Sequence, residues 1–119
     1  MRVLLVDDEE ELVATLSERL SFRGIEADYA LNSDGAMKKI EANCYDVAVL
    51  DVVMPGVGGI QLKKLLEKKC PDMKFLFLTG HGSESEFEIG AAEAGQDYYL
   101  IKPVPLQKLI EKMNEALNQ

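Results

Sequence analysis

The fold of this chain is decided by the stretch Asp46-Val-Ala-Val-Leu-Asp51-Val-Val-Met-Pro-Gly56. Its four consecutive apolar residues, Val47 to Leu50, are rich in branched side chains, which is typical of a strand buried on both faces of a parallel sheet. The strand ends on the carboxylate of Asp51, and Met54-Pro55-Gly56 stops it shortly beyond. Because chemistry in open α/β sheets collects outside the carboxyl ends of the strands, we expect a functional site around Asp51.

Short apolar segments and longer amphipathic segments alternate along the whole chain. Strand-like runs fall at residues 3–6, 25–30, 47–51, 75–79 and 97–101, and the second is the most alternating, as expected near a sheet edge. The alternation predicts an α/β fold with a doubly wound five-stranded parallel sheet, helices on both faces, and a single domain over residues 1–119. Five units of this size favour the flavodoxin-like strand order 2-1-3-4-5.

The segments between and after these strands carry apolar stripes at helical spacing. In chain order the stripes are Leu12, Leu16 and Leu20; Ala36, Met37 and Ile40; Leu62, Leu65 and Leu66; Phe87, Ala91 and Ala94; and Leu106, Leu109, Ile110, Met113 and Leu117. We expect Gly24 to close the first helix, Ser33 to cap the second, and Gly58-Gly59 to open the third. The fourth helix, beginning at Ser83 or Ser85, is rich in Ala and Gly and is the most weakly apolar of the five.

The bulk composition excludes several classes of function. A chain of 119 residues with 47% hydrophobic residues is long and apolar enough for one globular domain, and its net charge of −8 argues against nucleic acid or an anionic membrane as a direct partner. No apolar run approaches the roughly 20 residues that span a bilayer, and the N-terminus does not resemble a signal peptide. Cys44 and Cys70 lack metal-ligand spacing and suggest inert, reduced thiols. The expected location is the cytoplasm.

Four of the predicted strands end in polar residues that can meet at one edge of the sheet. These are Asp7-Asp8, Asp51, Thr79 and Lys102. Three carboxylates held together repel one another unless a cation lies among them, and hard oxygen ligands suit Mg²⁺. With a lysine and a hydroxyl beside them, such a cluster has the parts that phosphoryl transfer requires. Asp51 is then the candidate nucleophile, forming an acyl phosphate.

With these motifs in this order, the sequence resembles the CheY-like receiver domain of two-component response regulators, from about Val3 to Leu117. The motifs are Asp7-Asp8, Asp51 followed by Met54-Pro55 and Gly59, Thr79, and Tyr99-Leu-Ile-Lys102-Pro103. The resemblance implies that Asp51 accepts a phosphoryl group from the phosphohistidine of a histidine kinase or phosphotransfer protein. It implies a Mg²⁺ site formed by Asp8, Asp51 and the backbone carbonyl of Val53, with Asp7 acting mostly through a bound water.

The same resemblance assigns roles to the remaining residues. Thr79 and Lys102 would hold the phosphoryl oxygens, Tyr99 would swing inward on activation, and the Lys102-Pro103 bond would be cis. Phosphorylation would change the surface formed by the helix that begins at Ser83 or Ser85, the strand at residues 97–101 and the helix that carries Leu106 to Leu117. An output domain or downstream protein would recognise this change. A phosphorylation-dependent homodimer is left open, as is whether this is a stand-alone regulator or part of a longer protein.

Several residues depart from the family pattern or have plainer interpretations. Val53 has no polar side chain to position an attacking water, which predicts slow self-dephosphorylation. Val104-Pro105 replaces a commoner aromatic in that turn, and His81 has the character of a solvent-facing loop residue. Glu9 and the acids after it fit a helix N-terminus, where the macrodipole favours negative charge, and Tyr99 could be a packed strand aromatic.

Two other functions remain to be weighed. A Mg²⁺ phosphatase of the haloacid-dehalogenase kind also uses a strand-end aspartate, but it places a second aspartate two residues later, where this chain has Val53. A degenerate receiver would act only as a constitutive docking surface, and it would not need all five pocket residues. The leading prediction is therefore a phosphoacceptor signalling domain that catalyses only its own phosphotransfer and slow dephosphorylation.

Overall fold

The computed structural model describes residues 1–80 and 98–118 and contains one parallel sheet. The strands are β1 (Arg2–Val6), β2 (Glu26–Ala30), β3 (Val47–Asp51), β4 (Lys74–Thr79) and β5 (Tyr99–Ile101). Their order is β2-β1-β3-β4-β5, which confirms the predicted topology and the edge position of β2. His81 and the expected helix from Ser83 or Ser85 lie outside the described residues.

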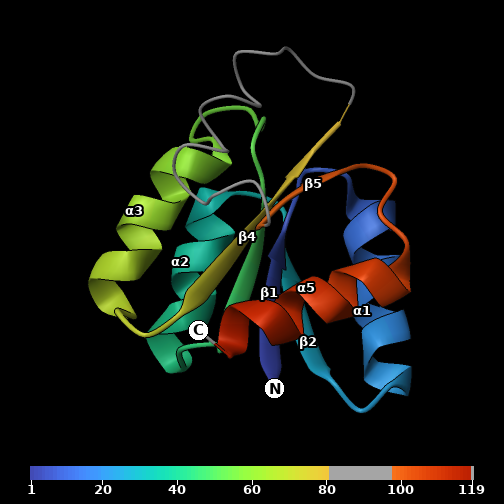
Figure 1. The fold of residues 1–119 in the computed structure, drawn as a ribbon. Helices are drawn as coiled ribbons and strands as arrows, with labels where there is room; N and C mark the ends of the chain where they lie inside the picture. Colours follow the sequence, from blue (N-terminus) through green and yellow to red (C-terminus); the bar gives the residue numbers. More distant parts are fainter. Residues whose placement is uncertain (81–97, 119) are drawn as a thin grey trace.

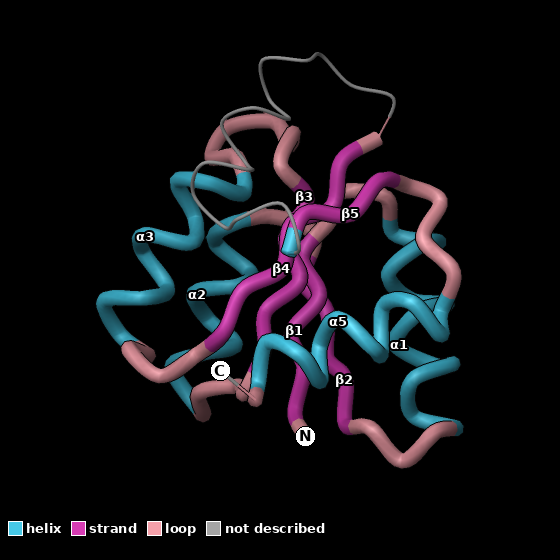
Figure 2. The backbone as a smooth tube through the Cα atoms, in the orientation of Figure 1, coloured by secondary structure: helices cyan, strands magenta, loops and turns pink. Residues whose placement is uncertain are grey.

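Helices cover both faces of the sheet, as predicted (Figures 1 and 2). They are α1 (Glu10–Phe22), α2 (Ser33–Ala42), α3 (Gly59–Lys69) and α5 (Leu106–Leu117). One core cluster joins α2 and α3 to the sheet, and a second joins α1 and α5 to the opposite face. In the described part of the chain, no helix has the length and apolarity needed to cross a membrane.

The central strand β3 is buried along its whole length, which explains its unbroken apolar run. Val47 and Val49 pack into the cluster under α1 and α5, whereas Ala48 and Leu50 pack into the cluster under α2 and α3. Full burial of a valine or leucine contributes about 1.5–3 kcal/mol, so both faces of this strand stabilise the sandwich. The strand is therefore a rigid support for the carboxylate of Asp51 at its end.

Two details of the helices differ from the sequence-based expectation, and a third confirms it. Asn32, not Ser33, caps α2, because its side chain accepts a hydrogen bond from the Gly35 N–H at 2.8 Å. Leu62 and Leu66 are fully buried four residues apart, whereas Leu65 lies at the side of that stripe and is 37% exposed. Gly24 has a φ of +80° directly after the α1 C-cap Arg23, which confirms that a glycine closes this helix.

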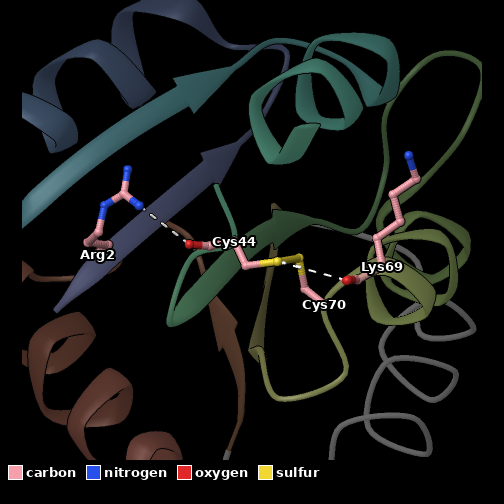
Figure 3. The surroundings of a disulfide bond; sticks show 4 residues. All are labelled: Arg2, Cys44, Lys69 and Cys70. Atoms are coloured by element: carbon pink, nitrogen blue, oxygen red, sulfur yellow. Dashed lines mark hydrogen bonds between the residues drawn. A yellow bond between two sulfur atoms is a disulfide. The ribbon is translucent and has the colours of Figure 1, made fainter. Parts of the chain in front are cut away.

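The prediction of two reduced thiols is wrong for this structure, because Cys44 and Cys70 form a disulfide (Figure 3). Cys44 lies three residues before β3, and Cys70 lies four residues before β4. These strands are adjacent and parallel, with Val47 opposite Lys74, so the residues that precede them meet at the amino edge of the sheet. Their separation of 26 residues in the sequence conceals this proximity, and the Cα atoms are 5.9 Å apart.

Candidate functional site

Three carboxylates gather at the carboxyl edge of the sheet, as the strand ends predicted. Asp7 directly follows β1, Asp51 is the last residue of β3, and Asp8 lies in the turn that leads to α1. Each contributes an oxygen that lies within 4.8 Å of the oxygens of the other two. Asp7 and Asp51 are buried, whereas Asp8 is exposed. This set of hard oxygen donors, open to solvent on one side, fits a Mg²⁺ ion that keeps several water ligands.

The segment after β3 is held in place by a close approach of backbone to backbone. The Gly59 N–H donates a hydrogen bond to the Val52 carbonyl at 3.1 Å. A Cβ at position 59 would overlap the Asp51 carbonyl, and one at position 58 would lie only 2.8 Å from the Val52 carbonyl oxygen. The Gly58-Gly59 pair therefore lets the first turn of α3 pack directly against the strand end that carries Asp51.

Lys102 supplies the positive charge of the site. Its Nζ lies 2.6 Å from Asp7 Oδ2, 3.1 Å from Glu9 Oε1 and 3.6 Å from Asp51 Oδ1. The Lys102 N–H donates to the Thr79 carbonyl at 2.7 Å, which ties the residue after β5 to the end of β4. The Lys102-Pro103 bond is cis, as the resemblance implied. Lys102 follows β5, which lies three strands from β1 in the sheet, and its side chain reaches back to Asp7 at the end of β1.

The electrostatics of the cluster are those of a crowded, partly desolvated group of charges. Burial raises the pKa of Asp51 to about 6, with the charge of Asp7 as the next cause, and Lys102 opposes both. Burial also raises the pKa of Asp7, against the lowering effect of its contact with Lys102. For Lys102, burial disfavours the ammonium, but its contacts with Asp7 and Asp51 outweigh this and raise the pKa. One lysine therefore compensates the carboxylates only in part.

Thr79 and Val53 also lie at this edge, whereas Tyr99 begins β5 opposite Phe77, two residues in from the edge. Thr79 is buried at the end of β4, one residue beyond Leu78, the register partner of Asp51, and its hydroxyl donates to the Gly80 carbonyl at 3.3 Å. The Val53 backbone hydrogen bonds to the Asp51 carboxylate, and its aliphatic side chain is 52% exposed. Tyr99 is already buried in the core cluster under α2 and α3. Its inward swing on activation stays a prediction.

Sequence reasoning missed the role of Glu9 in this cluster. Glu9 was interpreted as one of several acids at a helix N-terminus, and it is indeed the N-cap residue of α1. Its N–H also donates to Asp7 Oδ1 at 2.9 Å, and its carboxylate binds Lys102. The sequence signal was its position two residues after the strand-end Asp7, from which a long side chain can reach across the edge.

Comparisons with known proteins agree with this arrangement. A family model described as "Response regulator receiver domain" matches residues 3–114. A curated relative, the response regulator MprA of Mycobacterium avium (strain 104), is 34% identical over all 119 residues. This chain covers 52% of that relative, so it spans about half the length of the curated relatives it matches.

Solved structures with the same fold cover nearly the whole chain. A response regulator receiver domain protein from Clostridium thermocellum is 32% identical with a TM-score of 0.85, over 98% of this chain and 94% of that one. A response regulator from Burkholderia pseudomallei, solved with a phosphorylated aspartic acid, a calcium ion and citrate, is 28% identical. Its TM-score is 0.82, over 99% of this chain and 74% of that one.

Proposed function

This chain belongs to the response regulator receiver family, and from the geometry at Asp51 we propose that it is a switch controlled by phosphorylation of that residue. The phosphoryl donor is the phosphohistidine of a histidine kinase or phosphotransfer protein. The observation that carries the proposal is the convergence of Asp7, Asp8 and Lys102 on Asp51 from separate strand ends. The phosphorylated aspartic acid of the Burkholderia pseudomallei neighbour supports the same chemistry.

In the proposed site, Asp8, Asp51 and the Val53 carbonyl would hold Mg²⁺, and Asp7 would act through a bound water. The ion supplies positive charge against the carboxylates and the phosphoryl oxygens. An oxygen of Asp51 forms a bond to phosphorus while the bond from phosphorus to the donor histidine nitrogen breaks, and that nitrogen keeps the electron pair. The proposal requires Asp51 as its anion, which is the dominant form above its pKa of about 6.

Two side chains must exchange partners when the phosphoryl group arrives. The Lys102 Nζ binds Asp7 and Glu9 and lies 3.6 Å from Asp51 Oδ1. After phosphorylation it would turn to the phosphoryl oxygens on Asp51. The Thr79 hydroxyl would leave the Gly80 carbonyl, to which it donates at 3.3 Å, and donate to the phosphoryl group instead. Each contact with a charged acceptor is worth about 1.5–3 kcal/mol.

The movement of Thr79 is the first step of the proposed switch. Tyr99 would follow it into the space behind β4, and the surface formed by β5, α5 and the helix expected from Ser83 or Ser85 would change shape. Ile101, beside Tyr99 on β5, is 57% exposed and gives a partner an apolar contact on this surface. A shift from 1:99 to 99:1 between the two states requires about 5.5 kcal/mol, which two or three such phosphoryl contacts can supply.

The setting of the domain is also part of the proposal. Residues 1–119 form one receiver domain, and the greater length of the curated relatives supports an output domain or a downstream protein as the reader. The domain works in the cytoplasm and contacts neither nucleic acid nor membrane directly. The exposed aliphatic Val53 side chain predicts slow self-dephosphorylation, since it offers an attacking water no hydrogen bond.

Intact-mass spectrometry after incubation with acetyl phosphate and Mg²⁺ tests the proposal. We expect one added phosphoryl group on the unmodified chain, none after prior treatment with EDTA, and none on Asp51→Asn. Asp34→Asn is the matched control, because Asp34 is an exposed residue in the first turn of α2. Modification that persists in Asp51→Asn, or that proceeds equally without a divalent ion, would place the acceptor elsewhere.

A further inference from the structure

The cysteine pair at the amino edge of the sheet has no part in the proposed phosphotransfer, and it points to separate chemistry. We propose that Cys44 and Cys70 form a redox modification site that exchanges with low-molecular-weight disulfides. The pair lies at the opposite end of β3 from Asp51, where Cys44 precedes the strand and Cys70 follows α3 (Figure 3).

The backbone holds the two cysteines together independently of the sulfur–sulfur bond. On the Cys44 side, the Arg2 guanidinium lies 3.5 Å from the Cys44 carbonyl oxygen, and the Asp46 N–H donates to the Arg2 carbonyl at 2.9 Å. On the other side, the Cys70 N–H donates to the Leu66 carbonyl at 2.9 Å. The Lys74 N–H donates to the Asp46 carbonyl at 3.0 Å and joins the two segments. Because none of these contacts involves sulfur, they keep the thiols adjacent when the disulfide is reduced, so the bond can form again.

The two cysteine residues differ in exposure, and this assigns the order of reaction. Cys44 is exposed, whereas Cys70 is only 3% exposed beneath the end of α3. An external disulfide can therefore reach Cys44 but not Cys70. Cys44 Sγ also lies 3.9 Å from the Lys69 carbonyl oxygen, to which its thiol can donate when reduced.

A hollow beside the pair gives a small disulfide room to approach. Its volume is about 280 Å³, and Cys44, Cys70, Lys69, Asp46 and Asp72 are among the residues that line it. The carboxylates of Asp46 and Asp72 and the ammonium of Lys69 together give the lining a net charge of −1. The hollow therefore does not select for an anionic reagent, and we expect cationic cystamine to react faster than anionic oxidised glutathione.

The exchange proceeds in two steps. The Cys44 thiolate attacks one sulfur of the small disulfide, a bond forms between them, and the other half leaves as a thiolate that takes up a proton. The Cys70 thiolate then attacks the Cys44 sulfur, the intramolecular disulfide forms, and the second small thiol leaves. The protein loses two electrons and two protons, and one small disulfide becomes two thiols.

Oxidation would act on the part of the chain that carries the phosphoacceptor. The closed loop has a sequence separation of 26 and contains β3, Asp51 and α3. Closing such a loop constrains the unfolded chain, so the oxidised protein should melt roughly 10 °C above the reduced protein. In a compartment that keeps thiols reduced, a disulfide of this kind is transient and reports oxidising conditions.

Thiol alkylation followed by mass spectrometry, on the folded full chain incubated with oxidised glutathione, tests the proposal. The chain without substitutions, reduced beforehand, should lose both alkylatable thiols and regain them with dithiothreitol under native conditions. Cys70→Ser should retain one glutathione on Cys44, and Cys44→Ser should remain unmodified, because its remaining thiol is buried.

Four results would overturn the proposal. The first is that both thiols persist in excess oxidised glutathione, and the second is that dithiothreitol reduces the disulfide only after the protein unfolds. The third is that glutathione accumulates on Cys44→Ser. The fourth is that hydrogen peroxide oxidises the pair but no small disulfide does. Calorimetry gives a second measurement. The Cys44→Ser, Cys70→Ser double variant should melt like the reduced chain, and oxidised glutathione should not shift its melting temperature.

Discussion

Replacing the proposed phosphoacceptor should make the metal-free protein more stable. Asp51 is buried, and burial together with the charge of Asp7 raises its pKa from 3.8 to about 6. The folded state therefore binds this proton more tightly than the unfolded state. The resulting contribution to stability is fully present below pH 3.8 and is lost as the pH rises through about 6.

The size of the effect follows from the same shift. A displacement from 3.8 to about 6, at about 1.36 kcal/mol per pKa unit, corresponds to roughly 3 kcal/mol at neutral pH. Asp51→Asn removes the charge at nearly constant shape. It should raise the free energy of unfolding by about 2–3 kcal/mol and the melting temperature by roughly 5–15 °C.

Urea denaturation in EDTA, at a pH near neutral and again near 4, measures the difference between the unmodified chain and Asp51→Asn. The difference should be largest near neutral pH and should shrink toward pH 4, where the unmodified chain keeps its proton. Asp34→Asn, an exposed control, should differ little at either pH. A destabilised Asp51→Asn at neutral pH, or a difference that does not change with pH, would refute the reasoning.

Four further perturbations probe the same cluster. Lys102→Met leaves Asp7 and Asp51 without their cation and should cost about 3–5 kcal/mol in urea denaturation, and a loss below 1 kcal/mol would show that the ion pairs matter little. Glu9→Gln releases one partner of Lys102 and should speed labelling by acetyl phosphate several-fold, whereas slower labelling would make Glu9 a supporting residue. Gly59→Ala forces a Cβ onto the Asp51 carbonyl and should destabilise the fold by about 2–4 kcal/mol, compared with a near-neutral Gly80→Ala, whose Cβ would meet nothing within 4 Å. Mg²⁺ should raise the melting temperature of the unmodified chain by ligand linkage and that of Asp51→Asn by less, and equal shifts would place the ion elsewhere.

The fold could be predicted because its signals are local and repeated. The apolar run from Val47 to Leu50 indicates a strand buried on both faces, and that strand lies at the centre of the sheet. The alternation of strands and helices restricts the topology to a few parallel arrangements, since crossovers are right-handed and short. Element ends were less predictable: Asn32 and Ser33 are both good caps, and only the hydrogen bond to Gly35 distinguishes them.

The site could be predicted in outline because strand ends share one edge in a parallel sheet. That rule alone brings Asp7, Asp51, Thr79 and Lys102 together. It does not say which partner Lys102 takes, because a long side chain can reach several carboxylates. The position of Glu9, two residues after Asp7, permits the ion pair, but only the structure shows that Lys102 forms it.

The cysteine pair shows the same limit at the other end of the strands. Cys44 and Cys70 lie in separate segments without metal-ligand spacing, which predicts two reduced thiols. The strand order that was already predicted contained the contrary information, since β3 and β4 are neighbours and each follows one cysteine by three or four residues. Applying the strand order to both edges of the sheet would have placed the two thiols side by side.

A crystal structure of the chain with Mg²⁺ and beryllofluoride, a mimic of the phosphoryl group, tests the central claim most directly. We predict the mimic on an oxygen of Asp51 and one ion about 2.0–2.1 Å from oxygens of Asp8, Asp51 and the Val53 carbonyl. Lys102 should have left Glu9 for the mimic. An ion bound away from Asp51, or a Lys102 still paired with Glu9 beside an occupied Asp51, would contradict the account.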